Sequence, residues 1–311
     1  MFEKKNNYTD TKLIKPIKKY AFVFVCQKGR IEIESLFLVA SLKKFVKFDY
    51  EIIAALPKPK SIFGEISNIT LDFFNKMGVR TETFTNDFII KAAAKGINID
   101  PKENKALFLA NKAYALQIRT SADKIIFVDS DMIFHEEFTR NICFSIPFNA
   151  YLAGPGLYKT SSGKWDQIFK EMGVNMPNLR VKLNRENEGI DEYTFTPSFF
   201  NNSFYGIRTS CAKKLSKIWI KFSKKIFFQQ IIKNFNKTGE VPFNLALYKA
   251  GIIYNILNLD WKHKPYFHYY SDVNKLKYKP KIIDLAKSII KEHPEIKDLI
   301  SDNKEWAFIL E

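Results

Sequence analysis

The first part of the chain alternates between short apolar runs and longer segments in which apolar residues recur at helical spacing. The short runs are rich in β-branched and aromatic residues, which is typical of strands buried on both faces. We expect strands at 20–26, 50–56, 79–84 and 125–128, and helices at 31–47, 65–77 and 103–120. Strands that alternate with helices over short connections form right-handed units around a mostly parallel sheet. The first 130 residues therefore predict an α/β fold with a Rossmann-like layer.

Two aspartates directly follow the fourth predicted strand, within the stretch 127–134. Residues two positions apart in an extended chain face the same way, so Asp129 and Asp131 can point at one ligand while Ser130 faces away. Ionised carboxylates are costly to bury alone, and hard divalent ions such as Mg²⁺ and Mn²⁺ prefer carboxylate oxygens. Ligands of open α/β sheets bind beyond the carboxyl ends of the strands. The stretch predicts a metal site; a turn in which the aspartates cap the next helix is the alternative.

Beyond residue 140 the regular alternation stops. We expect strand-like segments at 150–154, 193–200, 204–207 and 252–257, with Asn201 to Ser203 as an interruption, and helices at 209–235, 240–250 and 279–310. Residues 155–190 are rich in Gly, Pro, Asn and charge, which predicts a long irregular segment of the kind that covers substrates. We predict a polar leader over 1–19, one domain over 20–275 with halves at 20–140 and 141–275, and a helical tail over 276–311.

The formal net charge of +16 indicates an anionic partner, which can be a nucleic acid, an acidic membrane surface or a phosphorylated small molecule. The helix 209–235 is strongly basic, and it and the tail could lie on an anionic membrane; a Lys-rich solvated surface is the alternative. The sequence has no Gly-x-Gly-x-x-Gly motif after its first predicted strand and no P-loop motif. Dinucleotide dehydrogenases and P-loop NTPases are therefore disfavoured.

The three cysteines, Cys26, Cys143 and Cys211, lie far apart without metal-ligand spacing, which suits a reducing compartment. No run of 18 apolar residues is present, and the first 19 residues are polar and lack the apolar core of a secretory signal. We expect a cytoplasmic protein, with peripheral contact at the inner face of the membrane if the basic helix binds lipid.

Three segments together carry a resemblance to a known family. They are the hydrophobic–Asp-x-Asp–hydrophobic stretch 127–134, the segment 199–207 with Asn201 and Asn202 between strand-like runs, and the late aromatic segment 267–270 with His268. In this order and spacing, over roughly residues 20–272, the chain resembles GT-A-fold glycosyltransferases. It is most similar to the glycogenin-like and bacterial lipooligosaccharide galactosyltransferase group.

The resemblance implies a GT-A fold in which a nucleotide-sugar half, 20–140, is merged with an acceptor half, 141–275. It also implies a divalent ion, Mn²⁺ or Mg²⁺, on the diphosphate of a nucleotide-sugar, with a UDP-sugar as the first expectation. The implied metal ligands are Asp129, Asp131 and His268, with His263 as a rival for the third position. The implied donor-binding residues are Gln27, Lys28, Lys112, Arg119, Asp129 and Ser130.

Two of these donor residues, Lys112 and Arg119, are seven positions apart and would share one face of the helix 103–120. A solvated helix face is the alternative for both. On the acceptor side, the resemblance points to Asn201, Asn202 and Glu240 as catalytic candidates, and Asp191 and Glu192 could compete with them. The family often has an Asp-Gln pair where this chain has Glu240, so retaining and inverting chemistry both stay open.

The expected function is a metal-dependent hexosyltransferase that moves a sugar from a nucleotide-sugar to a glycan or lipid-linked acceptor, as in polysaccharide biosynthesis. One alternative is a sugar-nucleotide nucleotidyltransferase, which the missing Gly-rich loop after the first strand disfavours. Another is a basic nucleic-acid-binding protein, which the +16 charge suggests. We do not expect nucleic acid as a partner, because no recognised binding motif is present.

Overall fold

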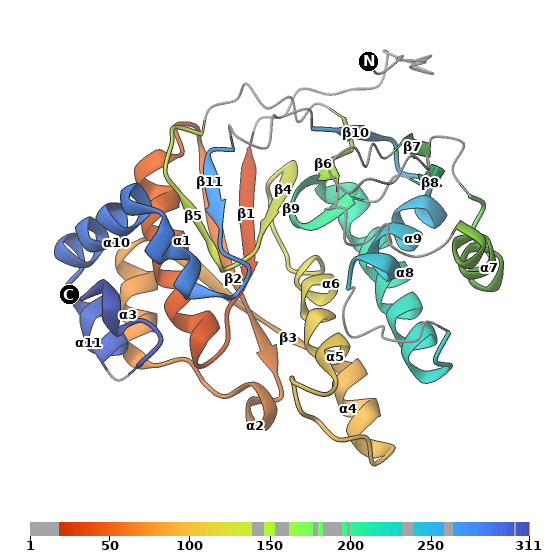
Figure 1. Ribbon diagram of the computed structural model, residues 1–311, viewed down its shortest axis with the longest axis horizontal. Coiled ribbons are helices and arrows are strands. Elements are labelled where there is room, and N and C mark those ends of the chain that lie inside the picture. Colours follow the sequence, from red (N-terminus) through yellow and green to blue (C-terminus); the bar gives the residue numbers. More distant parts are fainter. Residues whose placement is uncertain are drawn as a thin grey trace.

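A computed structural model describes residues 19–138, 146–152, 162–176, 180–182, 195–197, 200–231, 239–257, 264–301 and 303–310. Within these residues, seven strands form a central sheet that is covered by helices on both faces (Figure 1). The order of the strands across the sheet is β10-β6-β9-β4-β1-β2-β3. Their bounds are β1 Tyr20–Val25, β2 Tyr50–Lys58, β3 Val79–Thr85, β4 Lys124–Val128, β6 Phe148–Leu152, β9 Phe200–Arg208 and β10 Tyr254–Ile256.

Most neighbours in this sheet run parallel. The pairs β1–β2, β1–β4, β2–β3 and β6–β10 are parallel, whereas β9 lies antiparallel between β4 and β6. Two smaller antiparallel pairs complete the described strands: β5 (Met132–Phe134) with β11 (Tyr266–His268), and β7 (Arg180–Lys182) with β8 (Phe195–Pro197). The predicted α/β class with a mostly parallel, Rossmann-like sheet of the GT-A type is confirmed.

The helices connect these strands as the alternation predicted. The α-helices are α1 Arg30–Phe45, α2 Lys60–Phe63, α3 Asn68–Lys76, α4 Asp87–Ala94, α5 Lys105–Leu109, α6 Asn111–Ala115, α7 Ser162–Met172, α8 Thr209–Phe228, α9 Glu240–Ala250, α10 Pro280–Glu292 and α11 Glu295–Ser301. The tail also contains the 3₁₀ segments η6 (Val273–Tyr278) and η7 (Ala307–Ile309).

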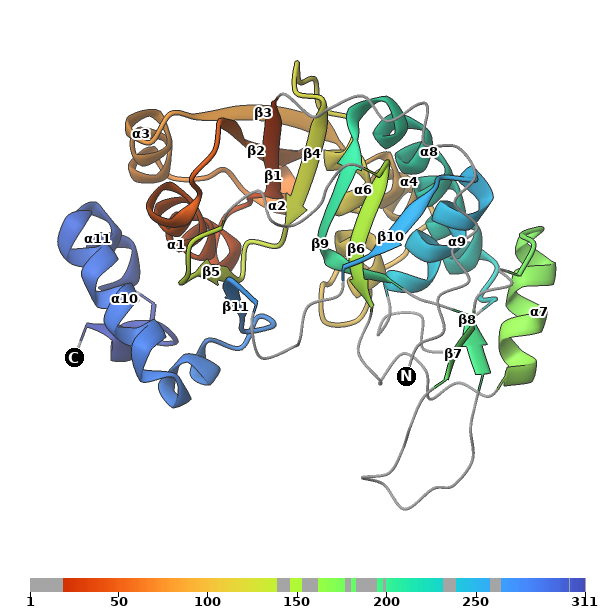
Figure 2. The ribbon, with the colours of Figure 1, turned by 90° about the horizontal axis from the view of Figure 1, so that it is seen from above.

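The two faces of the sheet bury separate cores, because successive side chains of a strand point to opposite faces. Phe22 and Phe24 of β1 pack in a core with α1, α3 and the tail. Ala21 and Val23 pack in a second core with α4, α6, α8 and α9. Figure 2 shows α10 and α11 beside α1 and α3, at the outer side of the first core. The amphipathic pattern of the tail is therefore explained by burial against the protein.

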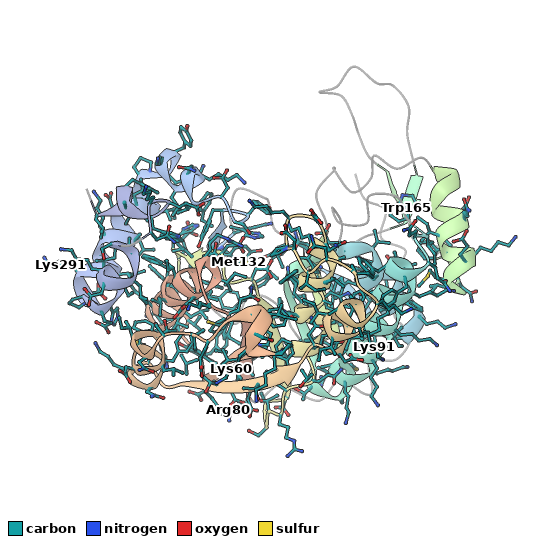
Figure 3. All side chains as sticks on the ribbon, turned by 90° about the horizontal axis from the view of Figure 1, so that it is seen from below. Lys60, Arg80, Lys91, Met132, Trp165 and Lys291 are labelled. Carbon is teal, nitrogen blue, oxygen red and sulfur yellow. The ribbon has the colours of Figure 1, made fainter. Side chains whose placement is uncertain are left out.

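Most charged side chains of the described residues lie outside these layers. Lys60, Lys91 and Lys291 are exposed at the surface, whereas Met132 of β5 is buried in the interior (Figure 3). The net positive charge is thus carried by a solvated surface around two apolar cores.

The helix expected at 103–120 is shorter and divided into α5 and α6. The reason is a side chain from another segment: Asn86 Nδ2 donates to the carbonyl oxygen of Leu107 at 3.0 Å and to Asn111 Oδ1 at 2.7 Å. In an undivided helix, the Leu107 carbonyl would accept from the backbone N–H of Asn111. An inserted donor of this kind is a known cause of helix breaks.

The expected interruption of a strand at Asn201 to Ser203 is wrong, because all three residues belong to β9. The strand is paired just before and just after this segment, at Phe200 with Leu152 of β6 and at Phe204 with Val128 of β4, and the register against β6 shifts in between. Polar residues interrupt the apolar pattern here without interrupting the strand. The helix α4 was not expected from the sequence. The predicted leader and the end of the basic helix lie wholly or largely outside the described residues. The expectation of a long irregular segment over 155–190 is wrong for its described part, which contains α7 and β7.

Candidate metal and donor site

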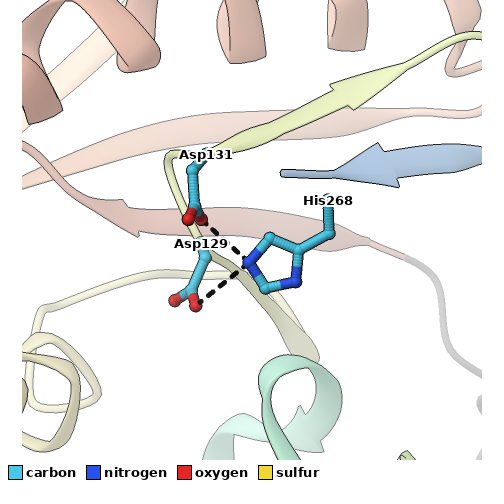
Figure 4. Close-up of side chains that lie close together, drawn as sticks. All are labelled: Asp129, Asp131 and His268. Atoms are coloured by element: carbon cyan, nitrogen blue, oxygen red, sulfur yellow. Dashed lines mark ion pairs between the residues drawn. The ribbon is translucent and has the colours of Figure 1, made fainter. Parts of the chain in front are cut away.

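Asp129, Asp131 and His268 come together beyond the carboxyl end of β4 (Figure 4). One ligand atom from each lies within 4.8 Å of the others. His268 Nε2 is 3.0 Å from Asp131 Oδ1 and 4.0 Å from Asp129 Oδ2. Two carboxylates and one imidazole form a donor set that suits Mn²⁺ and related divalent ions. These three residues could therefore hold a metal ion, as the sequence predicted.

The strand pairing explains how His268 reaches two aspartates that lie far from it in sequence. Asp129 follows β4, and its backbone N–H donates to the carbonyl oxygen of Ser203 in β9 at 2.9 Å. Asp131 directly precedes β5, whose first residue, Met132, is paired with His268 of β11. The antiparallel register of β5 and β11 thus places the imidazole beside the Asp131 carboxylate.

A strained turn follows His268. Tyr270 and Ser271 have φ angles of 55° and 61°, in the left-handed region that residues other than glycine rarely adopt. This turn directs the backbone N–H of Ser271 to Asp131 Oδ2 at 2.5 Å and stacks the Tyr270 ring on His268, with ring centroids 3.9 Å apart. The turn therefore fixes both the Asp131 carboxylate and the His268 ring. Sequence reasoning missed it, because neither residue type signals a positive φ.

Charges around Asp131 keep its carboxyl group ionised. Burial opposes ionisation of Asp131, but the hydrogen bond and charge of His268, with the charges of Lys112 and Arg30, hold the pKa of Asp131 well below its usual range. Lys112 Nζ lies 2.7 Å from Asp129 Oδ2 and 3.5 Å from Asn202 Oδ1. The site thus presents negative oxygen ligands at neutral pH, with a cation beside them.

A cleft of about 640 Å³ opens on this cluster between α1, α5 and α6. Asp129, Ser130, Asp131 and His268 all line it, together with Gln27. Five cations also line it: Lys28, Arg30, Lys102, Lys105 and Lys112. Gln27 Oε1 accepts a hydrogen bond from Asn111 Nδ2 at 3.4 Å, so the turn after β1 is linked to α6. A cleft with acidic ligands at one point and five cations around them fits an anion that binds together with a metal ion.

Glu34 is a site residue that sequence reasoning missed. It is buried on α1, contacts Arg30, and accepts a hydrogen bond from Ser130 Oγ at 3.2 Å. Burial, with a smaller contribution from the nearby Asp131 charge, raises the pKa of Glu34 to about 8. The sequence feature that could have pointed to Glu34 is the Arg30 and Glu34 pair, four residues apart in the helix that follows the first strand. Glu34 thus connects Ser130, which lies between the two aspartates, to α1, the helix that follows β1.

The acceptor-side candidates occupy two sides of β9 and the start of α9. Asn202 is buried and faces Lys112, whereas Asn201 lines a second cavity on the other side of His268. Glu240, the first residue of α9, has a pKa that is raised by burial and by Asp129 and lowered by Lys112 and His268. The structure thus brings Glu240 near Asp129.

Arg119 is the predicted donor residue that the structure does not bring to the site. Since α6 ends at Ala115, the seven-residue spacing does not place Arg119 on the face of Lys112. It is exposed at the opposite edge of the sheet, where its carbonyl oxygen accepts from Arg80 Nη2 at 2.7 Å. Arg80 lies away from Met132 in Figure 3. The rivals Asp191, Glu192 and His263 lie outside the described residues.

Internal contacts account for some of the lysines of the basic helix α8. Lys214, Lys224 and Lys225 donate to other segments, whereas Lys213 and Lys221 are exposed. The membrane contact of this surface stays a prediction. Among the described residues, the structure contains no helix with both the length and the apolar character needed to cross a bilayer.

Comparison with protein families gives one match. The family model described as the Rhodobacterales glycosyltransferase domain matches residues 22–238, which is more than half of the chain. The matched segment contains the strands from β1 to β9, the Asp129 and Asp131 pair and the part of the cleft lining that comes from α1 to α6. No curated protein matches the chain. The family match supports glycosyl transfer over the nucleotidyltransferase and nucleic-acid-binding alternatives.

Proposed function

The chain belongs to the Rhodobacterales glycosyltransferase domain family, and we propose that it transfers a hexose from a UDP-sugar to a glycan or lipid-linked acceptor with the help of Mn²⁺. The observation that carries this proposal is the convergence of Asp129, Asp131 and His268 inside a cleft lined by cations. The proposal includes the glycogenin-like grouping, the UDP-sugar as donor and Mn²⁺ as the ion.

The donor set supports a divalent ion at this point. Two carboxylates and an imidazole would hold the ion, and a bound divalent ion acts as a Lewis acid on the charge that develops on a departing diphosphate. The strained turn at Tyr270 and Ser271 keeps Asp131 and His268 in place, so little reorganisation is needed on binding.

The cations of the cleft provide the second part of donor binding. Lys112 is 14% exposed at its side chain and holds an ammonium beside Asp129, where it can also contact a phosphate oxygen. Lys28 and Arg30 flank the turn after β1, where a nucleotide bound at this edge of the sheet would extend. Positive charges fixed in a partly buried cleft stabilise a diphosphate more than charges in water do.

Glu240 is the residue that we propose acts as a base on the acceptor. Its carboxyl is close enough to Asp129, Lys112 and His268 for their charges to change its pKa. Burial raises that pKa, which makes the carboxylate a stronger base for the proton of an acceptor hydroxyl. Asn202, beside Lys112, is proposed to orient the transferred sugar.

The test is thermal stabilisation of the protein by UDP, GDP or CMP, each with and without Mn²⁺. We expect UDP to raise the melting temperature only when Mn²⁺ is present, because a ligand that binds the folded state alone stabilises it. The variant Asp131→Asn should lose this response, since it retains the acceptor for Ser271 but removes a charged ligand.

The matched control is Asp72→Asn, an exposed aspartate on α3, which should respond like the wild type. Stabilisation by UDP without any need for a metal ion, or an unchanged response of Asp131→Asn, would contradict the metal site. A response to GDP or CMP alone would replace UDP in the proposal.

A further inference from the structure

A second cavity, of about 900 Å³, lies on the other side of His268 from the donor cleft. It is enclosed by β5, β11 and the start of α10. His268 and Tyr270 line both the cavity and the cleft, so the two spaces adjoin at these side chains. A molecule in the cavity would meet His268, the one proposed metal ligand among the described residues that line it. This position suits the acceptor.

The walls of this cavity are aromatic. Tyr266, Phe267 and Tyr270 all line it, and Tyr270 is 53% exposed while its ring stacks on His268. Flat aromatic faces with a few polar groups are typical of pockets that bind the apolar face of a ring-shaped ligand such as a sugar.

The polar groups of the cavity are mainly cationic. Lys264, Lys279 and Lys281 line it, and Glu136 is the acidic residue among the described lining residues. Lys264 Nζ lies 5.8 Å from the ring centroid of Tyr266, and Lys279 Nζ lies 5.8 Å from that of Phe267. Lys264 and Lys279 are thus placed directly beside the aromatic walls. An ammonium beside an aromatic wall can bind an anionic group carried by a ring that packs on that wall.

Burial is an additional reason for an anionic ligand. It lowers the pKa of Lys264 to about 8, because the charged form loses hydration. An anion bound next to this side chain would favour its charged form. A neutral sugar would instead lie beside three ammonium groups without an ionic interaction with any of them.

From this arrangement we propose that the cavity binds an acceptor saccharide that carries an anionic group, a phosphate or a carboxylate, with its ring on Tyr266 and Tyr270 and its anionic group on Lys264, Lys279 and Lys281. The inference rests on the proposed function, because it assigns the acceptor class of the same site. It also explains why basic residues gather at the beginning of α10, far along the chain from the donor cleft.

The test measures the binding of three sugars to the protein saturated with UDP and Mn²⁺, so that the donor cleft is filled. The probes are glucose 6-phosphate, glucuronic acid and methyl glucoside, titrated by calorimetry. We expect one or both anionic sugars to bind at least about tenfold more tightly than methyl glucoside. Lys279→Met with Lys281→Met should remove most of that preference without changing UDP binding.

Lys264→Met serves as an independent variant inside the cavity, and Lys291→Met, at the outer edge of the tail in Figure 3, is the matched control. Equal affinity for charged and neutral sugars, no detectable binding of either anionic sugar, or an unchanged preference in the lysine variants would overturn the inference. Absence of any UDP response in the wild type would instead contradict the proposed function. Phosphate preferred over carboxylate, or the reverse, identifies which anionic group the cavity selects.

Discussion

The side chain of Trp306 joins the C-terminal tail to the strand that carries His268, and its removal should destabilise the whole fold. Trp306 is fully buried, and its ring stacks on Phe37 of α1 with centroids 5.0 Å apart and an interplanar angle of 6°. It also meets Tyr269 edge-on at 6.0 Å. The tail and α1 therefore share one core.

The expected cost of Trp306→Ala follows from these contacts. Truncation of a buried Trp to Ala removes about 3–5 kcal/mol of stability, which includes the cavity that is left behind. We expect about 4 kcal/mol, because the ring is fully buried and contributes to two aromatic pairs. This is a large share of the roughly 5–15 kcal/mol that stabilises a typical protein.

Trp306→Phe separates ring packing from polarity. The indole Nε1 is buried and finds no hydrogen-bond acceptor among the described residues. Phe keeps an aromatic ring against Phe37 and removes this unsatisfied donor, so the loss should be smaller, about 1 kcal/mol. Tyr278→Ala, at a side chain that is 81% exposed, should change stability by less than about 0.5 kcal/mol.

Urea denaturation followed by circular dichroism measures all three variants. The reasoning is refuted if Trp306→Ala loses less than about 1 kcal/mol, or if the tail unfolds in a separate transition that leaves the sheet unchanged. Either result would mean that residues 276–311 form an independent unit.

Two further predictions concern charged groups. Lys112→Met should weaken UDP binding in the presence of Mn²⁺ by about 10–100-fold, because a hydrogen bond to a charged group contributes about 1.5–3 kcal/mol. Calorimetry measures this affinity, and an unchanged value would contradict the role of Lys112. Asp87 should make the fold sensitive to acid: burial would raise its pKa, but hydrogen bonds from Lys224, Tyr114 and Lys91 outweigh burial and lower it to about 2. The contribution of Asp87 is therefore present above its ordinary value of 3.8 and is lost as the pH falls through about 2. Urea midpoints measured from neutral to acidic pH should fall more steeply for the wild type than for Asp87→Asn, and parallel curves would contradict this assignment.

The sequence contained enough information to predict the first four strands of the sheet and the position of the Asp129 and Asp131 pair. Apolar runs give the strands directly, and Asp129 and Asp131 stand out because two carboxylates directly follow such a run. His268 is different: only the antiparallel register of β5 and β11 brings it to the aspartates, and that register is a long-range feature. Its prediction came from the family resemblance and not from local pattern.

The remaining site features depend on tertiary contacts that no local pattern encodes. Glu34 reads as one polar residue of an amphipathic helix, and only the packing of α1 against Ser130 makes it part of the site. Arg119 was expected beside Lys112 because the apolar spacing continues past the point where Asn86 divides the helix. The second cavity is formed by segments more than 100 positions apart in sequence, from Met132 to Ile282.

Predictions that stay untested are the domain boundaries and the roles of Gln27, Lys28, Asn201, Asn202 and Glu240. The proposed function that unites them depends on a bound metal ion. The most direct measurement is a titration of the protein with Mn²⁺ in the presence of UDP, followed by the electron paramagnetic resonance signal of free Mn²⁺. The account predicts one site in the wild type and a loss of at least about tenfold in affinity in both Asp131→Asn and His268→Ala. Equal Mn²⁺ affinity in the wild type and both folded variants would contradict the metal site formed by Asp129, Asp131 and His268.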